Sequence, residues 1–228
     1  MALAPLFFLR AGQPSRRSNW DQAIVALPDS ANRTFEFHFE WQRGLFVNVQ
    51  HFPAAAFPDA QQNKGDGEKD TLYYPPPHYH LFADEYFLVT QGAGTWHLWD
   101  RDVRLAAGDK VKVPARAWHW FEGDPSPDRP LATEIYFDKG DAVMEERFFR
   151  NVLGYLADCH REEVEPSICQ LLLFFYSFEM VPGLRIARWE TLNLVLNTAI
   201  MYVGSAIGML LGYRSSYDEY YKAQKKSQ

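Results

Sequence analysis

The sequence predicts a mainly β protein in which short antiparallel strands form a barrel or sandwich, followed by a C-terminal α-helical appendage. Between residues 23 and 137, short segments alternate apolar and polar side chains and are separated by Gly, Asp and Pro, as in antiparallel sheets. After residue 141, apolar side chains recur at helical spacing instead. This change of period predicts a barrel with an N-terminal arm over residues 1–140 and a helical tail over residues 141–228.

The clearest strand covers residues 34–41, where four aromatic side chains alternate with polar ones: Phe35, Phe37, Phe39 and Trp41. Gly44 turns the chain, and residues 45–52 are predicted to pair with this strand as a hairpin. A strand fragment is expected over residues 23–27, and residues 57–70 are polar enough to predict an exposed loop. Further strands are expected over residues 85–90, 95–99, 110–113, 119–122 and 131–137.

Composition excludes several classes of protein. The net charge of −6 and the pI of about 5.6 argue against nucleic-acid binding, which requires a basic surface. Neither of the two cysteines belongs to a CxxC pair, so a zinc ribbon is excluded and reduced thiols are expected. The apolar start, residues 1–9, lacks the features of a signal peptide. We therefore expect an intracellular protein, cytoplasmic or attached to an intracellular membrane, that is not secreted.

Four residues have the pattern of a metal site. His78 and His80 are two apart, so on a strand both imidazoles point to the same side. Glu85 follows on the next predicted strand, and His119 begins a later one. Three imidazoles and one carboxylate suit one divalent transition metal; Fe(II) is favoured, with Mn, Ni, Cu and Zn as alternatives.

The spacing of these residues resembles the two cupin motifs. The first motif corresponds to HYHLFADEYFLVTQG and the second to GDKVKVPARAWHWFEG, and all four expected metal ligands are present. The resemblance implies a cupin-type β-barrel, also called a double-stranded β-helix. Three positions depart from the motifs: Leu72 and Arg116 replace glycines, and Gly123 replaces an asparagine. None of the three is an expected ligand, although Arg116 could reach the mouth of the pocket.

An alternative is a cupin barrel that has lost its metal, with the histidines as paired polar groups of the core. Four buried and unpaired ligand side chains would be costly, so the spacing favours a metal. Aromatic residues cluster around the ligands, and some should line a pocket for a small molecule. The candidate pocket residues are Tyr86, Trp96, His97, Trp118 and Arg116, with His97 considered as a neighbour of the ligands.

The order of a cupin core and a helical tail that ends in LLGYRSSYDEYY is similar to fungal cupin-domain proteins found with polyketide biosynthetic enzymes. Some of these are described as oxidoreductases of salicylaldehyde-type pathways. The resemblance implies a metal-dependent oxidoreductase that acts on a small, aromatic secondary metabolite. Two alternatives stay open: an isomerase, cyclase or lyase that uses the metal as a Lewis acid, and a non-catalytic binding protein for an apolar intermediate.

The last apolar segment, residues 191–213, contains no charged residue and is long enough to cross a bilayer as a helix. Glycines at positions 204, 208 and 212 form the stripe of small residues that lets membrane helices pack closely. Polar residues at positions 193, 197 and 205 reduce its hydrophobicity. The sequence therefore leaves two interpretations open: a membrane contact through residues 191–213, or a packed helix that could form a homodimer.

Overall fold

The structure is a computed structural model that describes residues 6–28, 33–42, 45–53, 75–124, 130–138 and 142–223. Contacts divide the chain into two compact units, one of Ala23–Lys139 and one of Met1–Gln22 with Gly140–Gln228. We call the first the barrel unit and the second the helical unit, and we describe each by itself.

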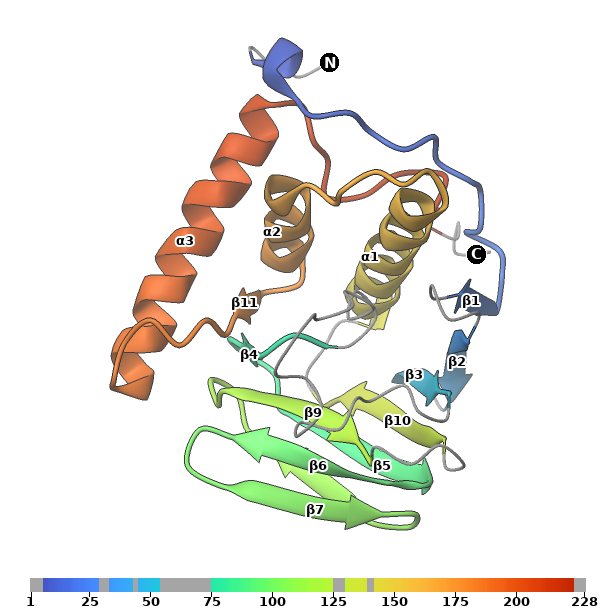
Figure 1. Ribbon diagram of the computed structural model, residues 1–228, viewed down its shortest axis with the longest axis vertical. Helices are drawn as coiled ribbons and strands as arrows, with labels where there is room; N and C mark the ends of the chain where they lie inside the picture. The colour runs from blue at the N-terminus through green and yellow to red at the C-terminus, as the bar shows by residue number, and fades with distance from the viewer. Residues whose placement is uncertain are drawn as a thin grey trace, which may run out of the picture. The chain divides into compact units, whose positions relative to one another are not determined.

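The barrel unit consists of two antiparallel sheets (Figure 1). One sheet has the strand order β1-β2-β3-β10-β5-β8, with bounds Ile24–Pro28, Thr34–Gln42, Leu45–Phe52, Leu131–Phe137, Glu85–Gln91 and Lys110–Val113. The second sheet contains four strands of this unit in the order β4-β9-β6-β7, with bounds His78–His80, His119–Gly123, Ala93–Leu98 and Asp102–Ala106. The predicted mainly β barrel is therefore confirmed.

Aromatic side chains fill the space between the two sheets. Phe52 of β3 and Phe87 of β5 each lie 5.6 Å from Phe121 of β9, measured between ring centroids. Trp96 of β6 stacks on the same ring at 5.1 Å. Because side chains alternate along a strand, these contacts establish which residues point inward, and the metal ligands Glu85 and His119 belong to that set.

Two motif glycines make the turns that hold the metal-binding strands in place. Gly92, between β5 and β6, has a φ of +75°, and Gly108, between β7 and β8, has a φ of +96°. Only glycine adopts this conformation without a steric penalty. At position 92 a Cβ would also lie 2.3 Å from the backbone oxygen of Pro130. The glycine spacing of the motifs thus has a direct backbone cause.

The predicted strands largely match those observed, with two differences. β7 (Asp102–Ala106) was not predicted, because its alternation is short and mostly polar. Trp41 is 50% exposed, so the buried aromatic face of β2 ends at Phe39. The loop predicted over residues 57–70 lies outside the described residues, as do Gly44 and Leu72.

The helical unit contains a 3₁₀ turn and three α-helices, with bounds η1 (Phe7–Leu9), α1 (Ala142–Arg161), α2 (Ile168–Ser177) and α3 (Glu190–Leu210). A short strand, β11 (Met180–Pro182), follows α2. The second helix, α2, ends at Ser177. The reason is a turn in which Glu179 adopts a φ of +57°, which a helix cannot contain.

The N-terminal arm corrects the predicted domain division, because residues up to Gln22 belong with the helices and not with the barrel. The backbone N–H of Ser15 donates to Glu162 at 2.9 Å, and that of Arg17 donates to Asp158 at 2.9 Å. Burial of Asp158 (2% exposed) is compensated by the backbone N–H of Arg17 and by the Tyr220 hydroxyl at 2.7 Å. These partners lie more than a hundred residues from the arm, so no local pattern could reveal them.

The buried thiol of Cys159 yields a testable prediction. It is fully buried, and burial raises its pKa to about 11, so it stays protonated at neutral pH, whereas Cys169 is partly exposed. Since the thiolate is the reactive form, we expect iodoacetamide at pH 7.5 to label Cys169 far faster. Mass spectrometry of native protein checks this, and a Cys169→Ser variant should be labelled only after denaturation. Fast labelling of that variant in its native state would contradict the packing of α1.

Candidate metal centre

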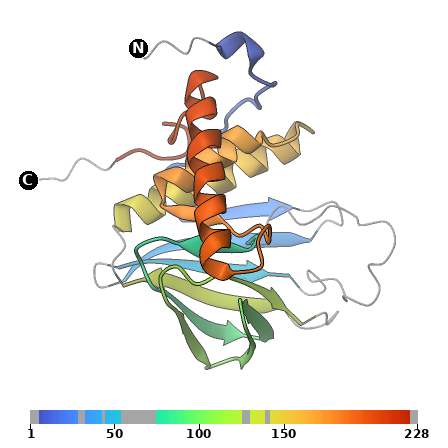
Figure 2. The same ribbon diagram turned by 90° about the vertical axis from the view of Figure 1, so that its left-hand side faces the viewer.

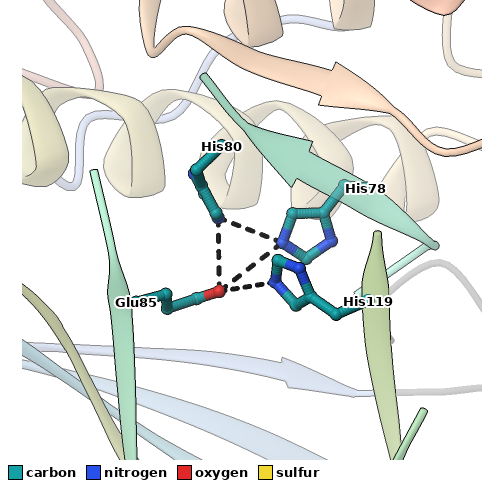
Figure 3. A group of neighbouring side chains, drawn as sticks. All are labelled: His78, His80, Glu85 and His119. Carbon is teal, nitrogen blue, oxygen red and sulfur yellow. Dashed lines mark hydrogen bonds and ion pairs between the residues drawn. The ribbon is translucent and has the colours of Figure 1, made fainter. Parts of the chain in front are cut away.

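The four predicted ligands come together from three strands of the barrel unit (Figure 3). His78 and His80 are the first and last residues of β4, and their alternation places both rings on the same side. His119 begins β9 directly opposite His78 in the antiparallel register. Glu85 begins β5 in the other sheet, so its carboxylate reaches the imidazoles across the barrel interior.

The donor atoms are close to one another and sheltered from water. The Oε2 atom of Glu85 lies 2.6 Å from Nε2 of His119, 3.3 Å from Nε2 of His80 and 3.9 Å from Nε2 of His78. The Nε2 atoms of His78 and His80 are 3.1 Å apart. All four side chains are at most 5% exposed. One ion could therefore contact all four ligand atoms at once.

Backbone carbonyls orient two of the imidazoles. Nδ1 of His78 lies 2.7 Å from the oxygen of Pro76, and Nδ1 of His119 lies 3.0 Å from the oxygen of Ala117. A carbonyl can only accept, so each Nδ1 carries the proton and donates it. The Nε2 atom of each ring is then left with a lone pair that points at the centre of the site. A hydrogen bond from the second ring nitrogen to a backbone carbonyl is typical of metal-binding histidines.

Electrostatics keep the ligand set in the form that a metal requires. Burial, followed by the proximity of His119, lowers the pKa of His78 to about 4, and burial also lowers the pKa of His80. Burial alone would raise the pKa of Glu85, but the neighbouring imidazoles, His80 foremost, hold it well below its usual range. At neutral pH His78 and His80 are thus neutral and Glu85 is ionised, which are the metal-binding states.

The donor set fits a divalent transition metal by its chemistry and its spacing. With metal–ligand distances of about 2.1 Å, neighbouring ligands of one ion lie about 3 to 4 Å from each other. The three imidazole nitrogens and the Glu85 oxygen are separated by distances of this order, and all four atoms lie within 4.8 Å of one another. A buried group of nitrogen lone pairs and one negative charge also needs a cation for compensation. Nitrogen and carboxylate ligands do not by themselves select one metal.

Comparison with known proteins agrees with this geometry. A family model described as "Cupin domain" matches residues 72–128. The chain is also 35% identical over 161 residues to "Probable oxidoreductase virH" of Hypocrea virens, an alignment that covers 68% of this chain and 71% of the relative. The chain belongs to the cupin family.

Two further relatives have similar names. "Oxidoreductase iacF" of Pestalotiopsis fici is 34% identical and "Oxidoreductase macE" of Penicillium terrestre is 28% identical, with 54% and 75% of this chain aligned. In both cases the chain spans 62% of the relative's length, which is less than two thirds. A cupin-like protein of Thermotoga maritima, known from its crystal structure, aligns with 16% identity and a TM-score of 0.32 over 54% of this chain and 77% of its own.

Of the five predicted pocket residues, only Trp96 is shown to point between the cupin sheets, where it is fully buried. His97 points the other way, because Trp96 and Leu98 on either side of it point inward. Its Nδ1 lies 2.8 Å from Asp102 and its Nε2 lies 3.2 Å from Glu122. His97 is therefore not a neighbour of the ligands, which corrects the sequence expectation.

Tyr86 also points outward, since Glu85 and Phe87 on either side of it point inward. Its ring stacks on Tyr136 with 5.1 Å between centroids. Trp118 is buried next to His119 and packs edge-to-face on Trp99 at 6.1 Å. The alternation of β5 predicts this outward position for Tyr86, so the sequence pattern alone is enough to place its side chain.

Arg116 lies on the exposed loop before β9, and its backbone explains the glycine of the cupin motif. The residue has a φ of +66°, in the left-handed region where glycine is favoured. Its Nε donates to the oxygen of Leu81 at 3.2 Å, and its backbone N–H donates to the oxygen of His80 at 2.7 Å. Arg116 thus ties the loop to the end of β4, and its guanidinium is held by backbone and not by a ligand residue.

Sequence reasoning missed two groups of residues near the metal site. Phe137, at the end of β10, packs its ring 4.7 Å from that of His80, so it supports that ligand. Asn48 and Gln50, on β3, are buried on the inner face of the barrel. A signal for the latter was present, because two amides alternate with valines in the strand LFVNVQHF.

The geometry predicts that metal content depends on each imidazole of the site. Protein purified without chelator should contain close to one transition metal per chain, and a His78→Ala, His80→Ala double variant should contain almost none, because too few ligands remain. Elemental analysis of purified protein measures this. His97→Ala is the matched control, since it also removes one imidazole of the barrel but should keep the metal. Full occupancy in the double variant would contradict the assignment.

Proposed function

We propose that the protein is a metal-dependent cupin oxidoreductase that acts on a small, aromatic, polyketide-derived secondary metabolite. The observation that carries this proposal is the buried, charge-compensating set of three imidazoles and one carboxylate in a barrel of aromatic side chains. Relatives at 35% and 34% identity are named oxidoreductases, which supports the reaction class. Fe(II) is the favoured metal, because three histidines and one carboxylate suit it and it is redox active.

The residues of the site have different roles in the proposed reaction. His78, His80, His119 and Glu85 would hold the metal, and Pro76 and Ala117 keep two of the imidazoles in the ligating tautomer through their carbonyl groups. A redox-active metal supplies one-electron chemistry when bound. The negative charge of Glu85 sets the total charge of the site, and burial strengthens its effect because water is excluded.

The interior of the barrel supports an aromatic substrate. Phe52, Phe87, Trp96 and Phe121 form a continuous group of rings between the sheets, and Phe87 lies 6.3 Å from His119. Flat apolar surfaces of this kind suit a planar ring through offset or edge-to-face contacts. The polyketide origin of the substrate rests on the sequence resemblance of the whole chain to fungal cupin-domain proteins.

A charge-removing substitution at Glu85 tests this function. Glu85→Gln keeps the shape of the side chain but removes its negative charge, and three imidazoles can still bind the metal more weakly. We expect the product formed per bound metal to fall roughly 10- to 100-fold, because the charge of the ligand set tunes the metal. Metabolite profiles of the producing strain identify the product, and an oxygen electrode shows whether dioxygen is consumed.

Glu122→Gln is the matched control, because it removes the same charge from the outer side of β9, where Glu122 contacts His97. Equal product per bound metal in wild type and Glu85→Gln would contradict the metal-centred mechanism and favour a binding protein. Turnover that is equal with Zn and with Fe, without dioxygen uptake, would favour the Lewis-acid alternative instead.

A further inference from the structure

Two amide side chains of β3 point into the barrel. Asn48 is fully buried and Gln50 is 5% exposed. In the antiparallel register they lie opposite Ile135 and Thr133 of β10, and β10 in turn pairs Phe137 with the metal ligand Glu85. Residues that alternate along a strand share a face, so both amides are on the same face as Glu85. They therefore lie inside the barrel, along the strands from the metal ligands.

Among the described residues these amides lack hydrogen-bond partners at several atoms. Both Nδ2 and Oδ1 of Asn48 are buried without a partner, as are Oε1 of Gln50 and Nε1 of Trp96. A buried polar group without a partner costs roughly 1–3 kcal/mol, and native proteins keep few of them. Four such atoms inside one barrel are groups that a bound molecule with complementary groups would pair.

We propose that Asn48, Gln50 and Trp96 form a hydrogen-bonding subsite for a planar aromatic molecule that bears both a carbonyl and a hydroxyl group. Nδ2 of Asn48 and Nε1 of Trp96 can donate to a carbonyl, whereas the oxygens of Asn48 and Gln50 can accept from a hydroxyl. The rings of Phe87 and Phe121 contact Trp96 and supply the flat apolar surface. This inference rests on the proposed function and names its substrate class.

The test uses metal-loaded full-length protein and two probes, 2-hydroxybenzaldehyde and ethylbenzene, which differ in hydrogen-bonding groups but not in ring size. Calorimetry should show that wild type binds 2-hydroxybenzaldehyde more tightly. Asn48→Leu should weaken that binding roughly 5- to 10-fold and leave ethylbenzene binding unchanged or tighter. Gln91→Met, an exposed position on β5, is a control for an amide lost elsewhere.

Two measurements separate this role from a structural one. Replacing an unpartnered buried amide with an apolar side chain should leave the melting temperature of the ligand-free protein unchanged or higher, whereas a structural amide would lower it. Metal content should also stay at the wild-type level. Equal binding of both probes to wild type, or equal binding of 2-hydroxybenzaldehyde to Asn48→Leu, would overturn the subsite. Loss of metal-dependent turnover in every preparation would overturn the proposed function instead.

A second inference rests on a separate observation in the helical unit. Polar and small residues of α3 are buried, whereas most of its large apolar residues are exposed. Its buried residues are mostly polar or small: Asn193, Asn197, Met201, Gly204, Ser205 and Gly208. Nine large apolar side chains of the same helix are instead exposed, among them Val195 at 58% and Val203 at 61%. Helices of water-soluble proteins normally show the opposite arrangement.

Hydrogen bonds account for the polar inner face. Oδ1 of Asn193 accepts from the backbone N–H groups of Ile186 and Ala187, at 2.8 and 3.0 Å. Nδ2 of Asn197 donates to the oxygen of Leu184 at 2.8 Å, and the hydroxyl of Ser205 donates to the oxygen of Leu172 at 2.8 Å. These contacts hold the inner face of α3 against α2 and the segment before α3.

Two glycines of the stripe of small residues, Gly204 and Gly208, also pack against α2. A Cβ at Gly204 would lie 2.3 Å from the side chain of Leu172, and one at Gly208 would lie 2.8 Å from the backbone oxygen of Cys169. Both neighbours belong to α2, which also packs on α1 through the rings of Phe174 and Tyr155. Since α1 contains charged residues such as Glu146 and Arg147, lipid cannot surround α3 in this arrangement.

Exposed apolar residues continue beyond both ends of α3. Beyond the C-terminal end lies η1 (Figure 2), which is joined to the helix by a hydrogen bond of 3.1 Å from the N–H of Leu6 to the oxygen of Leu210. Its residues Phe7 and Phe8 are 66% and 68% exposed. Before the N-terminal end, Trp189 is 66% exposed.

Two features favour a lipid surface over a protein partner. Of the nine exposed large side chains only Tyr202 has a hydrogen-bonding group, whereas protein interfaces contain about one hydrogen bond per 100–200 Å². The exposed residues Arg188 and Arg214 flank the helix, where they can meet anionic headgroups. We infer that the outer face of α3, together with η1 and Trp189, docks the helical unit on an anionic bilayer with the helix in the membrane plane.

Vesicle flotation of the full-length chain tests the docking surface. Wild type should float with vesicles of phosphatidylcholine and phosphatidylserine, and less with phosphatidylcholine alone. The double variant Val195→Glu, Val203→Glu should reduce the floating fraction at least roughly tenfold, because charges do not enter the acyl region. Trp41→Glu is the control, since Trp41 is equally exposed (50%) but lies on the barrel unit. Circular dichroism and metal content should be unchanged in all variants.

Light scattering without lipid tests the alternative that the exposed apolar face of α3 binds a second copy of the chain. A stable dimer that the Val195→Glu, Val203→Glu variant converts to monomer, combined with no flotation of wild type, would overturn the membrane inference. Wild type that stays at the bottom of the gradient with both vesicle compositions would overturn it as well.

Discussion

The buried carboxylate of Glu85 is the constraint on which the barrel interior depends. A negative charge that is 4% exposed requires compensation, and three imidazoles converge on it from the facing sheet. Burial lowers the pKa of His78 and His80 and keeps these two imidazoles neutral, so their nitrogens offer lone pairs rather than positive charge. A carboxylate surrounded by neutral donors is compensated fully only by a cation, which is why a metal is the simplest completion of this site.

The rest of the barrel serves to hold these four residues in place. Antiparallel pairing sets His119 against His78, and the turn at Gly92 ends β5, the strand that carries Glu85. Along the strands from the ligands the interior changes to aromatic rings and unpartnered amides. The gradient from metal ligands to hydrogen-bonding groups and flat rings suits a small oxygenated aromatic molecule, and this links the metal chemistry to the proposed substrate class.

The helical unit follows a different physical rule. Several of its buried polar groups form hydrogen bonds within the unit: Asp158 with the N-terminal arm, and Asn193, Asn197 and Ser205 along α3. Among the described residues α3 is the one helix long and apolar enough to cross a membrane, yet one of its faces is committed to α2. What remains exposed is the apolar face, so composition alone is consistent with a spanning helix, whereas packing points to a surface contact.

The sequence by itself determined the β class, the helical appendage and the four candidate ligands, because each depends on local spacing: alternation along strands, helical periodicity and the intervals within HYHLFADE and GDKVKVPARAWH. It also contained the outward positions of Tyr86 and His97, since both follow from alternation next to Glu85 and Trp96. Only the tertiary structure decided the partners of the arm and the burial of the polar face of α3. These depend on contacts between residues far apart in the chain, and no local pattern encodes them.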